Sequence, residues 1–175
     1  MKEAPPSDAV PREHKAHAPR FIGCFVLTIS DSKTPETDTS GALIREMLAK
    51  GGHSLVGHAI VKDEPAQVTA VVREGCANPA LQAFILTGGT GVTSRDATFE
   101  AVEALLDKRL TGFGELFRML SYQEIGAAAM LSRAQAGAVK GRALFSLPGS
   151  PNACRLALEK LILPELGHLI REISR

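Results

Sequence analysis

A glycine-rich turn followed by an acid is the part of this sequence whose residue types best suit chemistry. The apolar run that ends at Leu86 passes into a turn with three glycines in four positions, and Asp96 follows shortly after it. Glycines lack Cβ atoms, so backbone amides in such a turn can approach an anion closely, and a helix N-terminus adds further N–H donors. Asp96 would supply a hard oxygen ligand of the kind that Mg²⁺ prefers. The pattern indicates a phosphorylated or nucleotide ligand, with candidate contacts at Thr87, Gly88, Gly89, Thr90 and Gly91.

The turn does not match the common nucleotide-binding fingerprints. A P-loop carries Lys and then Ser or Thr after its last glycine, whereas Val92 and Thr93 follow Gly91 here. The dinucleotide pattern would place a third glycine where Ser94 stands. A tight strand-to-helix turn that uses glycine only for its geometry is therefore an open alternative.

Two more acids follow apolar segments of the chain. Asp31, preceded by Ser30, comes directly after one such segment, and Asp63 follows another. Each acid could simply be an N-cap or turn residue, because Asp is favoured in both places. Carboxylates that lie together, as Asp31, Asp63 and Asp96 would, can instead hold Mg²⁺ between phosphate oxygens during phosphoryl or nucleotidyl transfer.

Two further segments could contribute to a site. Pro148, Gly149 and Ser150 stand just before an expected helix, where a glycine and a hydroxyl would suit a phosphate. A plain turn is the alternative for that segment. Glu115 belongs to Gly112–Arg118, which is either a loop over the sheet edge or a helix start with an i,i+3 ion pair.

The first half of the chain alternates predicted strands with predicted helices. Apolar runs rich in β-formers predict buried strands, and apolar residues at helical spacing predict helices. The strands are expected at Phe21–Ser30, Ser54–Val61 and Ala83–Thr87, and the helices at Thr39–Lys50, Pro65–Gly75 and Thr98–Leu106. This order is typical of βαβ units in an α/β protein, with a mostly parallel sheet covered by helices on both faces. The carboxyl ends of parallel strands share one edge, so this fold would bring the acids and the glycine turn together.

The second half is predicted to begin with helices. We expect two short helical stretches, a strand pair that turns at Lys140 and Gly141, and two final helices separated at Pro164. Their expected ranges are Gly112–Arg118, Tyr122–Ser132, Ala134–Val139, Arg142–Leu147, Asn152–Leu163 and Pro164–Ile173. Before Phe21, prolines among charged and small residues predict a disordered tail over residues 1–20, which leaves one domain at 21–175.

Composition narrows the class of protein. The 175 residues suffice for one sizeable core, and the net charge of +1 gives no polybasic field for nucleic acid or an anionic membrane. No apolar run is long enough for a spanning helix, and residues 1–20 lack the apolar core of a secretory signal. The three cysteines form no C-x-x-C pair, which favours small buried thiols and a cytoplasmic location.

Five motifs, in this order, resemble the molybdopterin-binding proteins of molybdenum cofactor biosynthesis. The motifs are Thr87–Gly91, Arg95–Thr98, Gly112–Glu115, Leu131–Ala134 and Leu147–Pro151. The Asp38–Gly41 and Ser121–Gly126 segments are most similar to the bacterial B-type protein of that pathway. The resemblance covers essentially all of the chain from Phe21 onward.

The resemblance implies a three-layer α/β/α sandwich that assembles as a homotrimer or hexamer. It also implies binding of molybdopterin, a pterin with a dithiolene and a terminal phosphate, in concert with other proteins of the pathway. Related enzymes transfer AMP from Mg²⁺-bound ATP to that phosphate, and Asp63 and Asp96 match their two catalytic acids, which act through Mg²⁺. Ser30 and Asp31 match positions near the pterin and the nucleotide. The ligand-contacting loops of the family match the glycine turn and the segment Pro148, Gly149 and Ser150, and Glu115 falls in its Gly-Phe-Gly-Glu motif.

This chain departs from the family pattern at two positions. Phe99 stands where proline is frequent, and Asn152 stands where a lysine is common, so that a phosphate would lose a cation there. Asp63, however, is retained, although some B-type members lack this acid. The leading interpretation is an active molybdopterin adenylyltransferase. A non-catalytic molybdopterin carrier or scaffold is the main alternative, and hydrolysis of pyrophosphate bonds in nucleotide metabolites is a third.

Overall fold

The computed structural model describes residues 18–92 and 97–175 as a six-stranded sheet with helices on both faces. The strands are β1 (Gly23–Ile29), β2 (Ser54–Val61), β3 (Ala83–Gly88), β4 (Lys108–Arg109), β5 (Gln135–Val139) and β6 (Arg142–Leu147). Their order in the sheet is β2-β1-β3-β6-β5-β4. The mostly parallel α/β sheet predicted from the alternation of elements is confirmed.

Four adjacent strands run parallel, and this fixes where the site can lie. Leu27 of β1 pairs with Ala59 of β2 on one side and Leu86 of β3 on the other, while Thr87 of β3 pairs with Leu147 of β6. The segments that leave β1, β2, β3 and β6 at their carboxyl ends therefore meet at one edge of the sheet. β5 extends the sheet antiparallel to β6, and the short β4 pairs antiparallel with β5.

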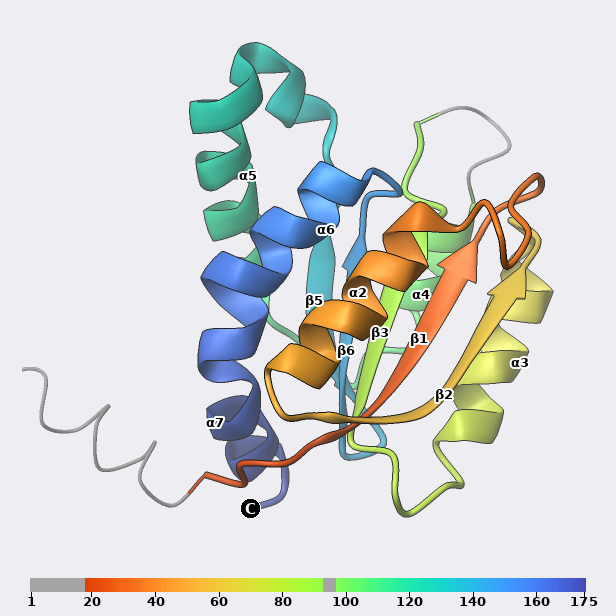
Figure 1. Ribbon diagram of the computed structural model, residues 1–175, viewed down its shortest axis with the longest axis vertical. Coiled ribbons are helices and arrows are strands. Elements are labelled where there is room, and N and C mark those ends of the chain that lie inside the picture. Colours follow the sequence, from red (N-terminus) through yellow and green to blue (C-terminus); the bar gives the residue numbers. More distant parts are fainter. Residues whose placement is uncertain (1–17, 93–96) are drawn as a thin grey trace, which may run out of the picture.

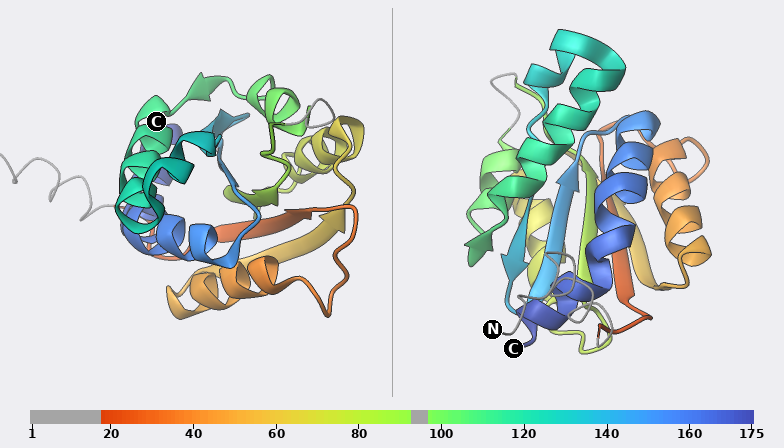
Figure 2. Two further views of the ribbon diagram at one scale, coloured as in Figure 1. Left: turned by 90° about the horizontal axis from the view of Figure 1, so that it is seen from above. Right: turned by 90° about the vertical axis from the view of Figure 1, so that its left-hand side faces the viewer.

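Helices cover the two faces of the sheet as two layers (Figures 1 and 2). One layer contains α2 (Thr39–Lys50), α5 (Thr111–Ile125), α6 (Pro151–Ala157) and α7 (Leu163–Ile173), and the other contains α3 (Pro65–Gly75) and α4 (Thr98–Glu103). Each layer has its own buried apolar cluster, because side chains of β1 and β3 alternate between the two faces. Val26 and Ile85 pack in the first cluster, and Leu27 and Leu86 in the second.

The helical region after β4 differs from the sequence prediction of two short helices. One helix, α5, runs unbroken from Thr111 to Ile125, and a 3₁₀ helix, η1 (Gly126–Leu131), follows it. Residues 119–121 contain no Gly or Pro that would interrupt a helix, whereas Gly126 ends α5 with a φ of 64°. Gly112–Arg118 is therefore helical, and its interpretation as a loop over the sheet edge was wrong.

The expected break at Pro164 is also absent. α6 continues through a π-helical turn, η2 (Leu158–Ile162), directly into α7, and Pro164 is the second residue of α7. A π turn shifts the hydrogen-bond pattern, so the missing N–H of proline can be tolerated without ending the helix. α4 ends at Glu103 instead of Leu106, and β4 had not been predicted.

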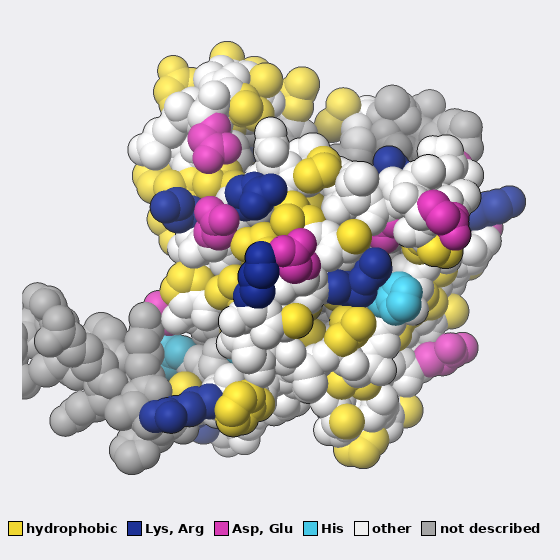
Figure 3. Space-filling model, in the orientation of Figure 1, with side chains coloured by type: hydrophobic (Ala, Val, Ile, Leu, Met, Phe, Trp, Pro, Cys, Tyr) yellow, Lys and Arg dark blue, Asp and Glu magenta, His cyan; other side chains and the backbone are white. Residues whose placement is uncertain are grey.

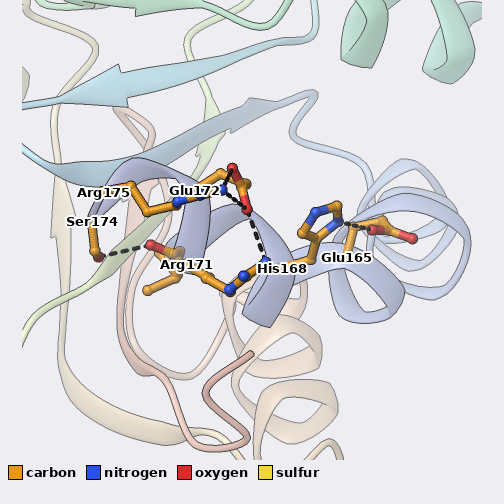
Figure 4. A network of polar contacts seen from close by, with 7 residues as sticks. Glu165, His168, Arg171, Glu172, Ser174 and Arg175 are labelled. Atoms are coloured by element: carbon orange, nitrogen blue, oxygen red, sulfur yellow. Dashed lines mark hydrogen bonds and ion pairs between the residues drawn. The ribbon is translucent and has the colours of Figure 1, made fainter. Parts of the chain in front are cut away.

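Charged side chains lie on the surface along α7 and just after its end (Figure 4). His168 Nδ1 lies 3.0 Å from Glu165, and Glu172 contacts Arg171 at 3.1 Å and Arg175 at 3.2 Å. Pairs this exposed contribute little to stability, about 0–1 kcal/mol each. Across the described residues, every helix falls short of the length and apolarity that a membrane span requires.

The segment before β1 lies along α7. A Cβ atom placed on Gly167 would meet the carbonyl oxygen of Pro19 at 2.5 Å, so the chain passes α7 closely at this point. The predicted disordered tail at residues 1–20 falls mostly outside the described residues, at 1–17, and for that part it stays a prediction.

Candidate functional site

A small hollow opens where β1, β3 and β6 end. Its volume is about 70 Å³, and polar groups from four chain segments surround it. The lining residues are Thr28, Ile29, Ser30, Lys33, Asp38, Ser40, Thr87, Gly88 and Gly149. Ser30, Thr87, Gly88 and Gly149 had been predicted as site residues, and the parallel sheet brings them together.

Asp38 forms the base of this hollow and had not been singled out as a site residue. Its side chain is 2% exposed and accepts hydrogen bonds from the hydroxyl of Thr28 at 2.8 Å and the amide of Gly41 at 2.8 Å. Arg45 lies 3.8 Å from the same carboxylate. Asp38 is therefore the N-cap that starts α2 and fastens it to β1. Its position directly before a helix was the available sequence signal.

Gly41 allows this close packing. A Cβ atom at that position would lie 2.1 Å from the Asp38 carboxylate and 2.6 Å from the Thr28 hydroxyl oxygen. Only a residue without a side chain fits there. The neighbouring Ser40 donates to the carbonyl oxygen of Gly149 at 2.7 Å, which ties α2 to the loop between β6 and α6.

Asp31 and Asp63 meet at the ends of β1 and β2. The backbone N–H of Asp63 donates to a carboxylate oxygen of Asp31 at 3.1 Å. One carboxylate oxygen of Asp63, Oδ1, is buried and accepts no hydrogen bond. A buried carboxylate oxygen is costly to leave without a partner, and a cation would supply one.

The donor set around Asp63 suits Mg²⁺, which prefers a few carboxylate oxygens together with substrate phosphates. Among residues 18–92 and 97–175, no cluster of three or more His, Cys, Asp or Glu side chains is placed to hold a metal by itself. Asp96, the other predicted metal ligand, lies outside the described residues. Asp31 and Asp63 are the predicted acids that the described residues place at this edge.

The backbone geometry of the turn itself requires glycine at two positions. Gly88 has a φ of 98°, and a Cβ atom there would lie 2.1 Å from the carbonyl oxygen of Ile29. Gly89 has a φ of 64°. The alternative interpretation, a tight turn, thus accounts for both, so their presence alone does not demonstrate a ligand.

Thr87 and Cys154 connect the turn to the opposite loop. The Thr87 hydroxyl donates to the carbonyl oxygen of Pro148 at 3.1 Å and lies 3.2 Å from Cys154 Sγ. Burial raises the pKa of the Cys154 thiol to about 11, so it stays protonated near neutral pH. The prediction of buried thiols is confirmed, since all three cysteines are buried and free.

A second, larger hollow lies beside the glycine turn and is mostly apolar. It measures about 330 Å³ and is lined by the turn, by α5 and η1, and by the start of α6. Its contributors include Thr90 and Gly91 from the turn and Ser150 from the α6 N-cap, whose side chain accepts from the Ala153 amide at 3.2 Å. A polar edge and an apolar wall together suit a small ligand with an apolar part and a polar group.

Comparison with known proteins identifies the family. The family described as "Probable molybdopterin binding domain" matches residues 25–168. The molybdenum cofactor biosynthesis protein B of Halalkalibacterium halodurans is 51% identical over 164 residues, which cover 93% of this chain and 96% of that protein.

The chain belongs to this family of molybdopterin-binding domains.

Solved structures of the family share its fold. A crystal structure of a molybdenum cofactor biosynthesis protein B superposes with a TM-score of 0.87 at 50% identity, covering 91% of this chain and 99% of that one. The tungsten cofactor synthesizing protein MoaB from Pyrococcus furiosus gives a TM-score of 0.80 at 39% identity, covering 90% and 100%. The resemblance inferred from five sequence motifs is confirmed, and the chain is a molybdenum cofactor biosynthesis protein of the B type.

One predicted site residue of this family member lies apart from the others. Glu115 is exposed on α5 and lines a separate hollow of about 290 Å³ with Phe99 and Arg118. The Gly-Phe-Gly-Glu motif containing it forms the first turns of α5. Within one chain, the structure does not bring Glu115 to the edge where β1, β3 and β6 end.

The two departures from the family pattern have defined places. Asn152 is exposed in the first turn of α6 and brings no cation to it. A cationic side chain does line the 70 Å³ hollow, namely that of Lys33, whose ammonium group donates to the Thr37 carbonyl oxygen at 3.1 Å. Phe99 lies in the first turn of α4 beneath the guanidinium group of Arg133.

Proposed function

We propose that this protein binds molybdopterin and adenylylates its terminal phosphate with Mg²⁺ and ATP. The observation that carries the proposal is the buried, unpartnered Oδ1 of Asp63 at the same sheet edge as the glycine turn. The backbone N–H of Asp63 donates to the Asp31 carboxylate, and Ser30, which precedes Asp31, lines the 70 Å³ hollow at the same edge. A pathway role follows from the family, and the nucleotidyl transfer is our proposal.

The proposed reaction is an in-line displacement at the α-phosphorus of ATP. An oxygen of the molybdopterin phosphate forms the new P–O bond, the bond between the α-phosphorus and the bridging oxygen breaks, and pyrophosphate leaves with its electron pair. Asp63 and Asp96 would hold the Mg²⁺, which when bound neutralises negative charge on the phosphate oxygens. Ser30 and the amides of the turn would orient the phosphates by hydrogen bonds, while the buried Thr87 hydroxyl holds the turn to the carbonyl oxygen of Pro148.

The larger hollow offers a place for the pterin. Its apolar wall comes from Phe117, Ala129 and other residues of α5 and η1, and its edge is formed by the glycine turn and Ser150. A volume of about 330 Å³ falls within the range of small-ligand pockets. A pterin seated there would bring its phosphate toward the turn and the start of α6.

Self-association to a homotrimer or hexamer is part of the proposal. An apolar stripe on α5, formed by Leu116, Met119, Tyr122 and Ile125 at three-residue spacing, is 48–64% exposed. Met130 and Leu131 of η1 continue it at 79% and 61% exposure, and Figure 3 shows hydrophobic side chains gathered over this tip. An exposed apolar surface of this kind indicates a protein interface.

A carrier without catalytic activity is the second candidate. Asn152 favours it, because the first turn of α6 lacks the cation that would hold a transferring phosphate. Such a protein would bind molybdopterin and pass it on without consuming ATP.

The deciding experiment measures pyrophosphate release from ATP with Mg²⁺, in the presence and absence of molybdopterin. Release that requires molybdopterin, together with formation of adenylylated molybdopterin, supports the transferase. Binding of molybdopterin without release above background would favour the carrier and reject the transferase. Binding of neither ligand would reject both.

A further inference from the structure

Arg133 connects two segments that lie far apart in the sequence. It stands between η1 and β5, and its Nε donates to the carbonyl oxygen of Thr90 at 3.2 Å. Its Nη2 donates to the carbonyl oxygen of Gly91, and its Nη1 pairs with Glu100 of α4. The guanidinium carbon also lies 4.5 Å from the centre of the Phe99 ring. One side chain thus binds both the end of the glycine turn and the start of α4.

These contacts fix the orientation of two peptide groups in the turn. In a trans peptide the carbonyl and the following N–H point in opposite directions. Because the carbonyl groups of Thr90 and Gly91 point to Arg133, the N–H groups of Gly91 and Val92 point away from it. Thr90, Gly91 and Val92 line the 330 Å³ hollow, and Arg133 is not among its lining residues.

We infer that Arg133 is a positioning residue that sets the amides of Gly91 and Val92 to bind an anionic group, namely a phosphate of the ligand. The part concerning phosphate rests on the proposed function. The part concerning the amides rests on the contacts of Arg133 alone. Arginine suits this role because its planar fork can bind two carbonyl oxygens and a carboxylate at once, whereas a lysine ammonium is a single point of charge.

Arg133 makes these contacts near the surface and not within the apolar core, so its role differs from that of a core packing residue. The side chain of Arg133 is 23% exposed and belongs to neither buried apolar cluster, and the Glu100 side chain is 58% exposed. Replacing the guanidinium group should therefore change the conformation of the glycine turn much more than the stability of the fold.

The test compares Arg133→Lys with the matched control Arg142→Lys. Arg142 also donates to two carbonyl oxygens, those of Lys140 and Asn78, but it lies at the opposite end of β6. The first measurement is the NMR chemical shift of the Gly91 and Val92 amides in the protein without ligand, which responds to hydrogen bonding of the preceding carbonyl groups. The second is the dissociation constant for ATP with Mg²⁺.

We expect Arg133→Lys to shift the resonances of the Gly91 and Val92 amides and to weaken ATP binding by about tenfold, the loss expected for a charge-assisted hydrogen bond. Arg142→Lys should change neither. Phe99→Leu, which removes only the ring, should act in the same direction with a smaller effect and serves if Arg133→Lys does not fold. Unchanged chemical shifts of both amides in the folded variants would overturn the inference, as would equal effects of the two arginine substitutions. If the wild-type protein does not bind ATP, the proposed transferase is rejected, while the amide chemical shifts still decide the role of Arg133.

Discussion

The backbone N–H of Asp63 donates to the carboxylate of Asp31 at 3.1 Å, although 32 positions separate the two residues. This contact orders the short turn after β2 against the end of β1. It leaves the Asp63 carboxylate at the sheet edge with one oxygen buried and without a hydrogen-bond partner. We therefore expect removal of the Asp63 carboxylate to affect function more than folding.

We expect Asp63→Asn to abolish Mg²⁺-dependent pyrophosphate release, with a loss of at least about 100-fold, because a neutral amide cannot replace a metal-binding carboxylate. The variant should fold normally, since the backbone N–H that contacts Asp31 is retained. Asp107→Asn is the matched control, because Asp107 also accepts a backbone N–H, from Lys140 at 2.6 Å, away from this edge. Equal activity of Asp63→Asn and wild type would remove Asp63 from the mechanism.

Replacing Asp38 should destabilise the fold. Asp38→Ala removes the N-cap of α2 and leaves the buried hydroxyl of Thr28 without its acceptor. Together these losses should lower the free energy of unfolding by about 2–4 kcal/mol. Urea denaturation measures this change.

Asp38→Asn distinguishes the hydrogen-bonding role of Asp38 from the role of its charge. An asparagine keeps an oxygen that can accept from Thr28 or from the Gly41 amide. We therefore expect it to lose clearly less stability than Asp38→Ala. If the two variants were equally unstable, the charge near Arg45 would matter more than the cap.

Alkaline pH should destabilise the protein through its buried thiols. Burial raises the pKa of Cys24 to about 12 and that of Cys154 to about 11, against 9.0 for a free thiol. The folded state therefore holds these protons more tightly than the unfolded state. The resulting stability is fully present below pH 9.0 and is lost as the pH rises toward 11–12.

Each thiol should lower the free energy of unfolding by about 1 kcal/mol between pH 8 and pH 10. Urea denaturation at the two pH values under reducing conditions measures the change. Cys154→Ala should show a smaller drop in stability over this interval than wild type, even if it is less stable at pH 8. An equal drop in both proteins would assign the pH dependence to other groups.

Disrupting the apolar stripe on α5 should dissociate the assembly. We expect Met119→Glu to shift the protein toward the monomer in sedimentation or light-scattering experiments, because the charge would be buried at the interface. Phe21→Glu is the control, since Phe21 is 74% exposed but lies before β1, away from α5. A monomeric wild-type protein would contradict the proposed self-association.

The sequence by itself determined the elements whose signals are local. α2, β2 and α3 have the predicted boundaries, because their apolar spacing, Pro65 and the glycines after α2 act within a few residues. The ordered motifs also determined the family, which the comparisons confirm. The failed predictions concern the extent of α4 and α5, the passage through Pro164 and the strand β4. A two-residue strand has no periodicity of its own, and β4 forms because it pairs with β5.

Only the tertiary structure decided which side chains meet. Apolar periodicity predicts a strand but not its neighbours, so the proximity of Asp31 to Asp63 required β2 to lie beside β1. The same holds for Thr28 with Asp38, and for Arg133 with the glycine turn. Each of these contacts depends on strand order and on the path of a loop, which are set by packing of the whole sheet between its two helical layers. The sequence could therefore indicate the types of residue in the site, whereas the fold determined their arrangement.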